Sequence, residues 1–347
     1  MNSESDNLVA HNVHRPVTNS ECSAIAIAVE GASPAPEGEP VLWGSLLTEI
    51  VDILAEAELD MPEVDAQRIL EEAAGVHASE LHDLLQQSTT TWTASRVYSM
   101  VSRRCAGEPL QYVLGRWAFR SLDLLVDRRV LIPRPETEVV AGWAVKFASA
   151  VFEKNMRTSQ QSKLGMMSRS QQPHEHLVNI VDLGTGSGAI ALAVAQECEN
   201  VRVFATDVSG EALAVARANL AGIGSDAATR VTLHEGDWFT ALPASIKGHI
   251  DVVVANPPYI GSHELLPPIV ADWEPLPALR AGPNGNEHIV RLIRESPSWL
   301  RPGGVLILEI APQMSAKLLD LAYQKGFRSR IEHDLAGRER VFIGVKR

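Results

Sequence analysis

The segment VVVANPPYIG (252–261) joins an apolar run to residue types that can do chemistry. The apolar run is typical of a buried strand, and Asn256, Pro257, Pro258 and Tyr259 follow it directly. Proline has no N–H and a fixed φ, so Pro257 and Pro258 present carbonyl oxygens without competing donors. The residue before a proline is held extended, which projects the side-chain carbonyl of Asn256 from the strand end. The tetrapeptide therefore predicts a cage of acceptors for a planar –NH₂ group, with the flat ring of Tyr259 against its plane.

Such a cage suits chemistry at an amide nitrogen, which is a poor nucleophile because its lone pair is delocalised. When that nitrogen attacks a methyl group, positive charge builds on it, and fixed carbonyl oxygens stabilise this charge more in the transition state than in the ground state. Alignment of the reacting atoms contributes up to roughly 7–11 kcal/mol in ideal cases. No general base is required, because the proton becomes acidic once the charge forms. A plain strand-terminating turn is the alternative interpretation of the tetrapeptide.

A glycine-rich turn lies upstream, in DLGTGSG (182–188), between an apolar strand and an apolar helix. Its glycines fall at every second position, which differs from the GxGxxG spacing of the dinucleotide fingerprint. Glycine lets the backbone turn sharply and approach a ligand closely. The residues predicted to bind a ligand here are Gly184, Thr185, Gly186, Ser187 and Gly188.

Acidic and aromatic residues follow the next two predicted strands. Asp207 ends the second strand, where a carboxylate can accept hydrogen bonds from two ribose hydroxyls. Together with the glycine turn, it indicates an adenosine-containing ligand. Trp238 either lies against the adenine or belongs to the core, and Asp237 can accept from the adenine amino group. Asp182 either faces the charged end of the ligand or caps neighbouring amides.

Alternating strands and helices must position these residues. From residue 177 onward the predicted strands are 178–183, 202–207, 231–235, 250–255, 304–310, 328–333 and 340–345. With helices between most of them, they predict an α/β fold whose parallel sheet is covered by helices on both faces. Ligands bind such sheets beyond the carboxyl ends of the strands, where the strand order reverses. If 178–183 and 250–255 are neighbours, the glycine turn and the tetrapeptide face each other across one cleft.

The N-terminal part of the chain differs in composition and period. Residues 1–40 carry six acidic residues against one arginine, which predicts a disordered acidic tail. Residues 41–115 show helical periodicity and predict a small all-helical domain. The predicted helices start from Ser45 as N-cap, run from Pro62 to Gly75, and cover 79–87 and 94–104. From these residues alone, a packing or dimerisation role and a substrate-docking role are equally supported.

Residues 116–347 are predicted to form the α/β domain. Its first part, 116–135, is a hairpin linker, in which SLDLLVDRRVLI predicts two short strands around Asp127 and Arg128. A helix is predicted over about 139–152. The polar segment 154–176, rich in serine and glutamine, is expected to be a flexible insertion.

Composition narrows the classes of partner. The net charge of −12 disfavours direct binding of nucleic acid, which usually requires a basic face. The sequence contains no apolar run of the roughly 18–20 residues that span a bilayer, and its polar N-terminus is unlike a signal peptide. Its three cysteines have no metal-binding or CxxC spacing, which is typical of a reducing compartment. A cytoplasmic protein without a membrane partner or a metal site is therefore predicted.

Several motifs resemble known enzymes. DLGTGSG, the TD that ends at Asp207, DWF and NPPY resemble, in this order, the class I (Rossmann-like) S-adenosylmethionine-dependent methyltransferases that modify planar amino groups. NPPY is shared by adenine-specific DNA methyltransferases and protein-glutamine methyltransferases. Four further segments are similar to the HemK/PrmC family of peptide-chain release factor N5-glutamine methyltransferases. They are GEPLQYVLGRWAF (107–119), LIPRPETE (131–138), WEPLPAL (273–279) and DLAGRERV (334–341).

This resemblance implies S-adenosylmethionine as the cofactor. The implied substrate is the glutamine of the Gly-Gly-Gln motif in class I peptide-chain release factors. The family pattern places the methionine and ribose portion of the cofactor at 184–188 and Asp207, and the adenine beside Trp238. It places the glutamine amide at 256–259, with Asn256 also next to the cofactor. It favours the docking role for the helical domain.

Three alternatives remain. A sibling group methylates a ribosomal-protein glutamine, but it typically carries Pro-Arg-Ser-Pro where this chain has Pro133-Arg134-Pro135-Glu136. A nucleic-acid adenine methyltransferase needs a basic groove and a flipped base, which the net charge disfavours. A cofactor-binding scaffold without catalysis is disfavoured by the intact NPPY and glycine turn.

Overall fold

The computed structural model describes residues 41–165 and 177–347, so the predicted acidic tail (1–40) lies outside the described residues. The chain divides between Leu114 and Gly115 into two compact units. The N-terminal unit contains β1 (Val41–Leu42), α2 (Trp43–Glu56), α3 (Pro62–Ala74), α4 (Ala78–Leu84), β2 (Ser88–Thr89), α5 (Thr91–Cys105) and α6 (Leu110–Leu114).

Each long helix of the N-terminal unit buries one face. On α2, Leu46, Ile50 and Leu54 recur at four-residue spacing and are fully buried in the core of this unit. Gly75 ends α3 in the left-handed conformation, with φ of 68°, which glycine adopts without a Cβ clash. The predicted end of this helix is thereby explained.

Two predicted helix boundaries in this unit are wrong, and one strand pair accounts for both. β1 and β2 pair antiparallel, with Val41 opposite Thr89 and Leu42 opposite Ser88. The extended Leu42 is therefore the residue before α2, and Ser45 lies in the first turn instead of at the N-cap. Because β2 needs extended backbone, α4 ends at Leu84 and does not reach residue 87.

The C-terminal unit contains the larger sheet. Its strands are β3 (Arg116–Phe119), β4 (Leu122–Leu125), β5 (Val178–Leu183), β6 (Val201–Asp207), β7 (Val231–Glu235), β8 (Ile250–Ala255), β9 (Leu300–Glu309), β10 (Phe327–His333) and β11 (Glu339–Lys346). Its α-helices are α7 (Pro135–Gly165), α8 (Ala189–Glu197), α9 (Gly210–Gly222), α10 (Ser225–Ala228), α11 (Pro268–Ala271), α12 (Leu276–Leu279), α13 (Glu287–Glu295) and α14 (Ser315–Gln324). Short 3₁₀ turns are η1 (Trp238–Ala241), η2 (Ala244–Ile246), η3 (Ser296–Ser298) and η4 (Pro312–Met314).

Seven of these strands form one sheet in the order β10-β11-β9-β8-β5-β6-β7. The α/β prediction is confirmed, including the expected parallel pairing of β5 with β8. The expectation of an all-parallel sheet is wrong at one end, since β11 runs antiparallel to both β9 and β10. β10 and β11 are joined by a short turn, and so short a connection allows only antiparallel neighbours.

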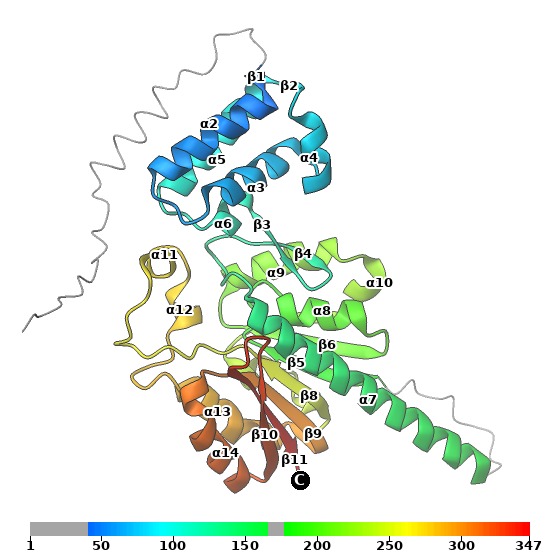
Figure 1. Ribbon diagram of the computed structural model, residues 1–347. Coiled ribbons are helices and arrows are strands. Elements are labelled where there is room, and N and C mark those ends of the chain that lie inside the picture. Colours follow the sequence, from blue (N-terminus) through cyan, green and yellow to red (C-terminus); the bar gives the residue numbers. More distant parts are fainter. Residues whose placement is uncertain (1–40, 166–176) are drawn as a thin grey trace, which may run out of the picture. The chain divides into compact units, whose positions relative to one another are not determined.

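Helices cover both faces of this sheet (Figure 1). Side chains of α13 and α14, such as Leu292 and Leu318, pack in one core with Val181 and Val253 of the central strands. α7 and α8 pack against the other face. β5 and β8 are buried along almost their whole length, as expected for central parallel strands.

The predicted hairpin lies earlier in the chain than expected. Its strands are β3 and β4, and the turn between them is at Arg120 and Ser121, with Arg120 at φ of 53°. The Asp127 carboxylate accepts a hydrogen bond from the backbone N–H of Arg129 at 3.1 Å. This side-chain turn bends the backbone there, so no second strand forms beyond it.

α7 is longer than predicted and continues through the first part of the expected flexible insertion. Residues 153 to 157 lack an apolar stripe, but most of their types favour helix. Glu153 and Arg157 form an ion pair at 3.4 Å, one helical turn apart. The remainder of the insertion, 166–176, lies outside the described residues. Within the described part of the chain, no helix has the length and apolar character needed to cross a membrane.

Candidate active site

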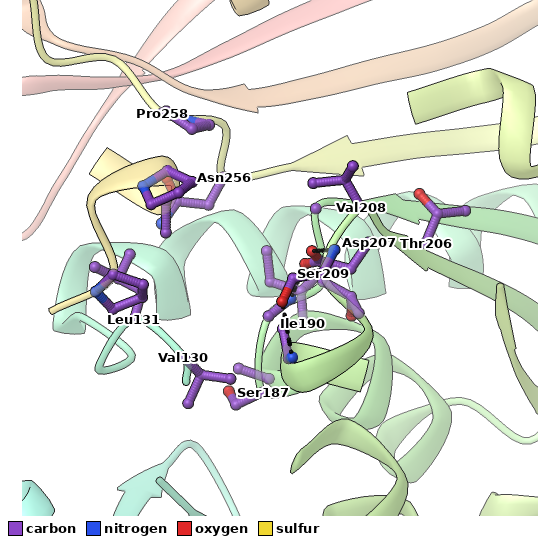
Figure 2. Close-up of a pocket in the computed structure, with 18 of the residues that line it drawn as sticks. Val130, Leu131, Ser187, Ile190, Thr206, Asp207, Val208, Ser209, Asn256 and Pro258 are labelled. Carbon is purple, nitrogen blue, oxygen red and sulfur yellow. Dashed lines mark hydrogen bonds between the residues drawn. The ribbon is translucent and has the colours of Figure 1, made fainter. Parts of the chain in front are cut away.

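A cavity of about 250 Å³ lies at the carboxyl ends of β5, β6 and β8, where the strand order reverses. Figure 2 shows Asn256 and Pro258, from the end of β8, together with Asp207 and Ser209, from the end of β6. Of the predicted site residues, Gly184, Thr185, Gly186, Ser187, Asp207, Trp238, Asn256 and Pro258 line this cavity. Topology therefore unites residues that lie more than seventy positions apart in the sequence.

The glycine turn has a conformation that other residues rarely adopt. Gly184 and Gly186 have φ of 71° and 56°, in the left-handed region where a Cβ is strained. A Cβ on Gly184 would also lie 3.3 Å from the ring of Trp238. The N–H of Gly184 donates to the Thr206 carbonyl at 2.9 Å, which holds the turn to the end of β6. Gly188 is the residue before α8 and lies outside the cavity lining.

Asp207 is held by the backbone around it. Its Oδ2 accepts from the N–H of Gly186 at 2.9 Å, and its Oδ1 accepts from the N–H of Ser209 at 2.9 Å. Burial raises the pKa of this carboxyl, although the backbone donors oppose that effect. Each carboxylate oxygen has a second acceptor site, so Asp207 can still accept hydrogen bonds from the hydroxyl groups of a ligand in the cavity.

Trp238 forms the wall beside the glycine turn. Its backbone is in the left-handed region, with φ of 48°, and its ring lies 5.3 Å from the ring of His288, centroid to centroid. The indole is half-buried and lines the cavity, which favours the ligand-facing interpretation over a purely core tryptophan. Asp237 also lines the cavity, and its carboxylate pairs with Arg291 at 2.7 Å. His288 was not predicted, because no sequence motif marks it.

Asp182 does not line the cavity and acts as a cap. Its side chain is 1% exposed, and Oδ2 accepts from the Thr185 hydroxyl at 2.6 Å and from the Ala191 N–H at 3.1 Å. It therefore joins the glycine turn to the first turn of α8. Burial raises the pKa of this carboxyl to about 7, and the nearby charge of Asp207 acts in the same direction.

Asp182→Asn is expected to flatten the dependence of stability on pH. Because the pKa is raised in the folded state, the folded protein binds this proton more tightly than the unfolded chain. The stability from this group is therefore complete below about pH 4 and is lost as pH rises through about 7. Between pH 5 and pH 8, we expect the wild-type free energy of unfolding in urea to fall by roughly 1–3 kcal/mol more than that of the variant. Asp226→Asn, on an exposed residue, is the control, and superimposable pH profiles of wild type and Asp182→Asn would contradict the prediction.

The NPPY tetrapeptide divides between the cavity and the core. Asn256 and Pro258 line the cavity, whereas Pro257 is buried and Tyr259 lies outside the lining. The Tyr259 ring packs against the core, and its hydroxyl donates to Glu309 at 3.2 Å. Burial and the Glu309 charge raise the pKa of the Tyr259 phenol. The predicted stacking of Tyr259 on a substrate amide thus finds no support in the cavity lining, and the ring instead anchors the segment.

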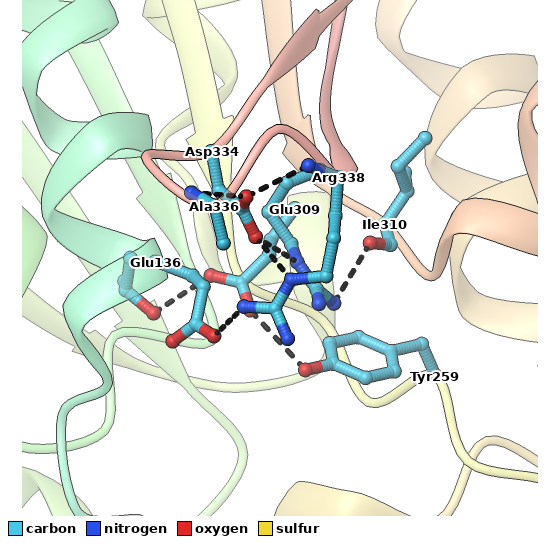
Figure 3. A network of polar contacts seen from close by, with 9 residues as sticks. Glu136, Tyr259, Glu309, Ile310, Asp334, Ala336 and Arg338 are labelled. Carbon is cyan, nitrogen blue, oxygen red and sulfur yellow. Dashed lines mark hydrogen bonds and ion pairs between the residues drawn. The ribbon is translucent and has the colours of Figure 1, made fainter.

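Behind Asn256 lies a chain of polar contacts that the sequence did not reveal. Asn256 Nδ2 donates to Thr137 Oγ1 at 3.1 Å, and Thr137 Oγ1 donates to Glu309 Oε2 at 2.7 Å. Figure 3 shows the Glu309 carboxylate beside Tyr259, whose hydroxyl donates to the other oxygen, Oε1. Thr137 belongs to the motif LIPRPETE, but the sequence did not predict its contact with Asn256.

Ion pairs connect the motifs LIPRPETE, WEPLPAL and DLAGRERV around the same segment. Arg134 of LIPRPETE pairs with Glu274 of WEPLPAL at 2.5 Å. Glu136 pairs with Arg338 of DLAGRERV at 2.6 Å, and Arg338 also contacts Asp334 at 2.8 Å (Figure 3). These ion pairs hold segments that are far apart in the sequence in contact next to the NPPY tetrapeptide.

Comparison with known proteins agrees with this geometry. Residues 45–115 match the PrmC N-terminal domain, and residues 149–271 match the methyltransferase small domain. A release factor glutamine methyltransferase of Moorella thermoacetica is 38% identical over 306 residues, covering 87% of this chain and 97% of that protein. The chain belongs to the release factor glutamine methyltransferase family.

A second relative agrees with this assignment. The release factor glutamine methyltransferase of Streptomyces coelicolor is 36% identical over 308 residues, covering 87% of this chain and 98% of its own length. A solved structure of a protein-(glutamine-N5) methyltransferase (release factor-specific) from Alicyclobacillus acidocaldarius is 25% identical, with a TM-score of 0.33, and covers 62% of this chain and 94% of its own. As a member of the release factor glutamine methyltransferase family, the chain is an enzyme, and its C-terminal unit is the methyltransferase domain.

Proposed function

We propose that the enzyme transfers a methyl group from S-adenosylmethionine to the side-chain amide nitrogen of the glutamine in the Gly-Gly-Gln motif of class I release factors. The observation that carries this proposal is the union, in one cavity, of the acceptors Asn256 and Pro258 with the glycine turn and Asp207. Release factor glutamine methyltransferases at 38% and 36% identity support the choice of substrate. Such a substrate implies that the enzyme works in the cytoplasm.

The donor set fits an adenosine-containing cofactor. Asp207 is fixed by two backbone N–H groups and keeps acceptor sites for ribose hydroxyls. The missing Cβ at Gly184 lets the Trp238 ring pack closely against the turn, and the part of the indole that lines the cavity can lie beside a base. We therefore assign the ribose to Asp207, the adenine side to Trp238, and the methionine portion to the glycine turn. When bound, S-adenosylmethionine supplies an electrophilic methyl group on a sulfonium sulfur.

The chain's own contribution to the reaction is placement and charge stabilisation. The carbonyl oxygens of Asn256 and Pro258 accept the hydrogens of the glutamine amide and so direct its nitrogen. As the amide nitrogen accepts the methyl group, positive charge would grow on it, and the fixed carbonyl oxygens of Asn256 and Pro258 would stabilise that charge. The surplus proton then leaves to water. These residues need neither a general base nor a metal for this step.

The N-terminal unit is proposed to dock the release factor. Its residues 45–115 match the PrmC N-terminal domain, and its helices bury their own core without the C-terminal unit. A separately folded unit of this kind can recognise a part of the substrate remote from the glutamine.

Incubation with labelled S-adenosylmethionine and a class I release factor tests the proposal. We expect one methyl group per release factor, located on the glutamine of Gly-Gly-Gln by mass spectrometry. A release factor with that glutamine changed to alanine is the matched control and is expected to remain unlabelled. Equal labelling of both proteins, or preferential labelling of a ribosomal protein or of nucleic acid, would overturn the proposed function.

A further inference from the structure

The polar chain behind Asn256 is buried and complete. Thr137 is 4% exposed and Glu309 is 1% exposed, and both lie in the C-terminal unit with Asn256. The contacts run from Asn256 Nδ2 to Thr137 at 3.1 Å, from Thr137 to Glu309 Oε2 at 2.7 Å, and from the Tyr259 hydroxyl to Glu309 Oε1 at 3.2 Å. Buried polar groups in such a chain cost free energy if any contact is lost.

The hydrogens available in this chain of contacts determine which group donates and which accepts. The Tyr259 phenol and the Thr137 hydroxyl each have one hydrogen, and the Glu309 carboxylate has none. If both hydroxyls donate to Glu309, Thr137 Oγ1 has only lone pairs left for Asn256. Burial raises the pKa of the Glu309 carboxyl, whereas the hydrogen bonds from the two hydroxyls and the Arg340 charge oppose that effect and favour the carboxylate form.

The orientation of the Asn256 amide follows from this direction. An asparagine side chain can present either its NH₂ group or its carbonyl oxygen to a neighbour, and local contacts decide which. If Oδ1 faced Thr137, the lone pairs of Oδ1 and of Thr137 Oγ1 would face each other without a hydrogen between them, in a buried place. Nδ2 is therefore held on Thr137, and Oδ1 is left as the free acceptor of the residue that lines the cavity.

We propose that Thr137 and Glu309 are positioning residues that select this orientation of Asn256, so that its carbonyl oxygen, and not its NH₂ group, meets the substrate amide. The proposal rests on the proposed function only in the identity of that amide. In the opposite orientation the NH₂ group would point at the hydrogens of the substrate amide. That arrangement would not stabilise the positive charge that grows on the substrate nitrogen in the transition state.

Thr137→Val and Thr137→Ser form a matched pair for the test. Valine keeps the shape but cannot accept from Asn256, whereas serine keeps the hydroxyl and loses only a methyl group. We expect Thr137→Val to lower kcat for methyl transfer by about 10- to 100-fold, less than loss of a whole transition-state contact. The KM for release factor and the Kd for S-adenosylmethionine should stay within about threefold. Thr137→Ser should restore kcat to within about threefold of wild type. Equal loss in both variants, or full activity of Thr137→Val, would overturn the proposal.

A second measurement does not depend on activity. In ¹⁵N-labelled protein, the Asn256 side-chain NH₂ signal is identified by its absence in Asn256→Ala. We expect one of its protons to exchange with water at least tenfold faster in Thr137→Val than in wild type or Thr137→Ser, because its acceptor is gone. Unchanged exchange in Thr137→Val would contradict the positioning role, even in an enzyme that methylates release factor. If wild type fails to methylate release factor but the exchange pattern is as expected, the orientation stands and the proposed substrate is wrong.

Discussion

Replacement of Asn256 by alanine is expected to lower kcat for methyl transfer by about two to three orders of magnitude or more, because a fixed acceptor of the developing charge is removed. The affinity for S-adenosylmethionine should stay within several-fold, since Asp207 and the glycine turn are unchanged. Pro258 alone then has to hold the substrate amide. Single-turnover methylation of release factor, with calorimetry for cofactor binding, measures the two effects separately.

Asn179→Ala is a suitable control for this variant. Asn179 lies near the start of β5, at the opposite end of the strand from the cavity, and its side chain donates to the His249 carbonyl at 3.1 Å. Its loss should leave kcat within about twofold of wild type. If Asn256→Ala stays fully active while its fold is intact, Asn256 does not hold the amide, and catalysis must be assigned to other groups.

Replacement of Asp207 by asparagine is expected to weaken S-adenosylmethionine binding by about 10- to 100-fold, equivalent to roughly 1.5–3 kcal/mol for hydrogen bonds to a charged group. One oxygen of Asp207 accepts from Gly186 and the other from Ser209. In asparagine, the NH₂ group must therefore face one of these N–H donors. The variant loses an acceptor for ribose and also loosens the glycine turn, so the Kd measured by calorimetry should rise.

Saturating cofactor should restore most of the kcat of Asp207→Asn, because this residue is assigned to binding and not to the transferred methyl group. Asp226→Asn changes an exposed carboxylate on α10, paired with Arg230 at 2.9 Å, and should leave the Kd unchanged. A kcat that remains low at saturation, with a Kd like that of wild type, would place Asp207 in the chemical step instead of the binding site.

Much of the fold was predictable because it depends on local patterns. Mostly apolar strands such as β5 and β8 are typical of central strands buried on both faces, and the glycine turn marks the end of the first of them. The antiparallel β11 and the polar continuation of α7 were missed for a related reason. Apolar periodicity reports burial, whereas strand direction depends on the connection, and an exposed helix such as the end of α7 needs no apolar stripe.

The candidate site also has a part that local sequence predicts and a part that depends on tertiary contacts. The groups available for chemistry were predictable from the sequence: rigid carbonyls after β8, a glycine turn after β5 and a carboxylate after β6. These follow from proline and glycine geometry and from the position of each residue at a strand end. Packing of the folded chain places Tyr259 against the core and puts Thr137 and Glu309 in contact behind Asn256. Thr137 and Glu309 are 172 positions apart, and such a hydrogen bond leaves no periodic trace in a sequence, because its partners meet only after the sheet and helices have packed.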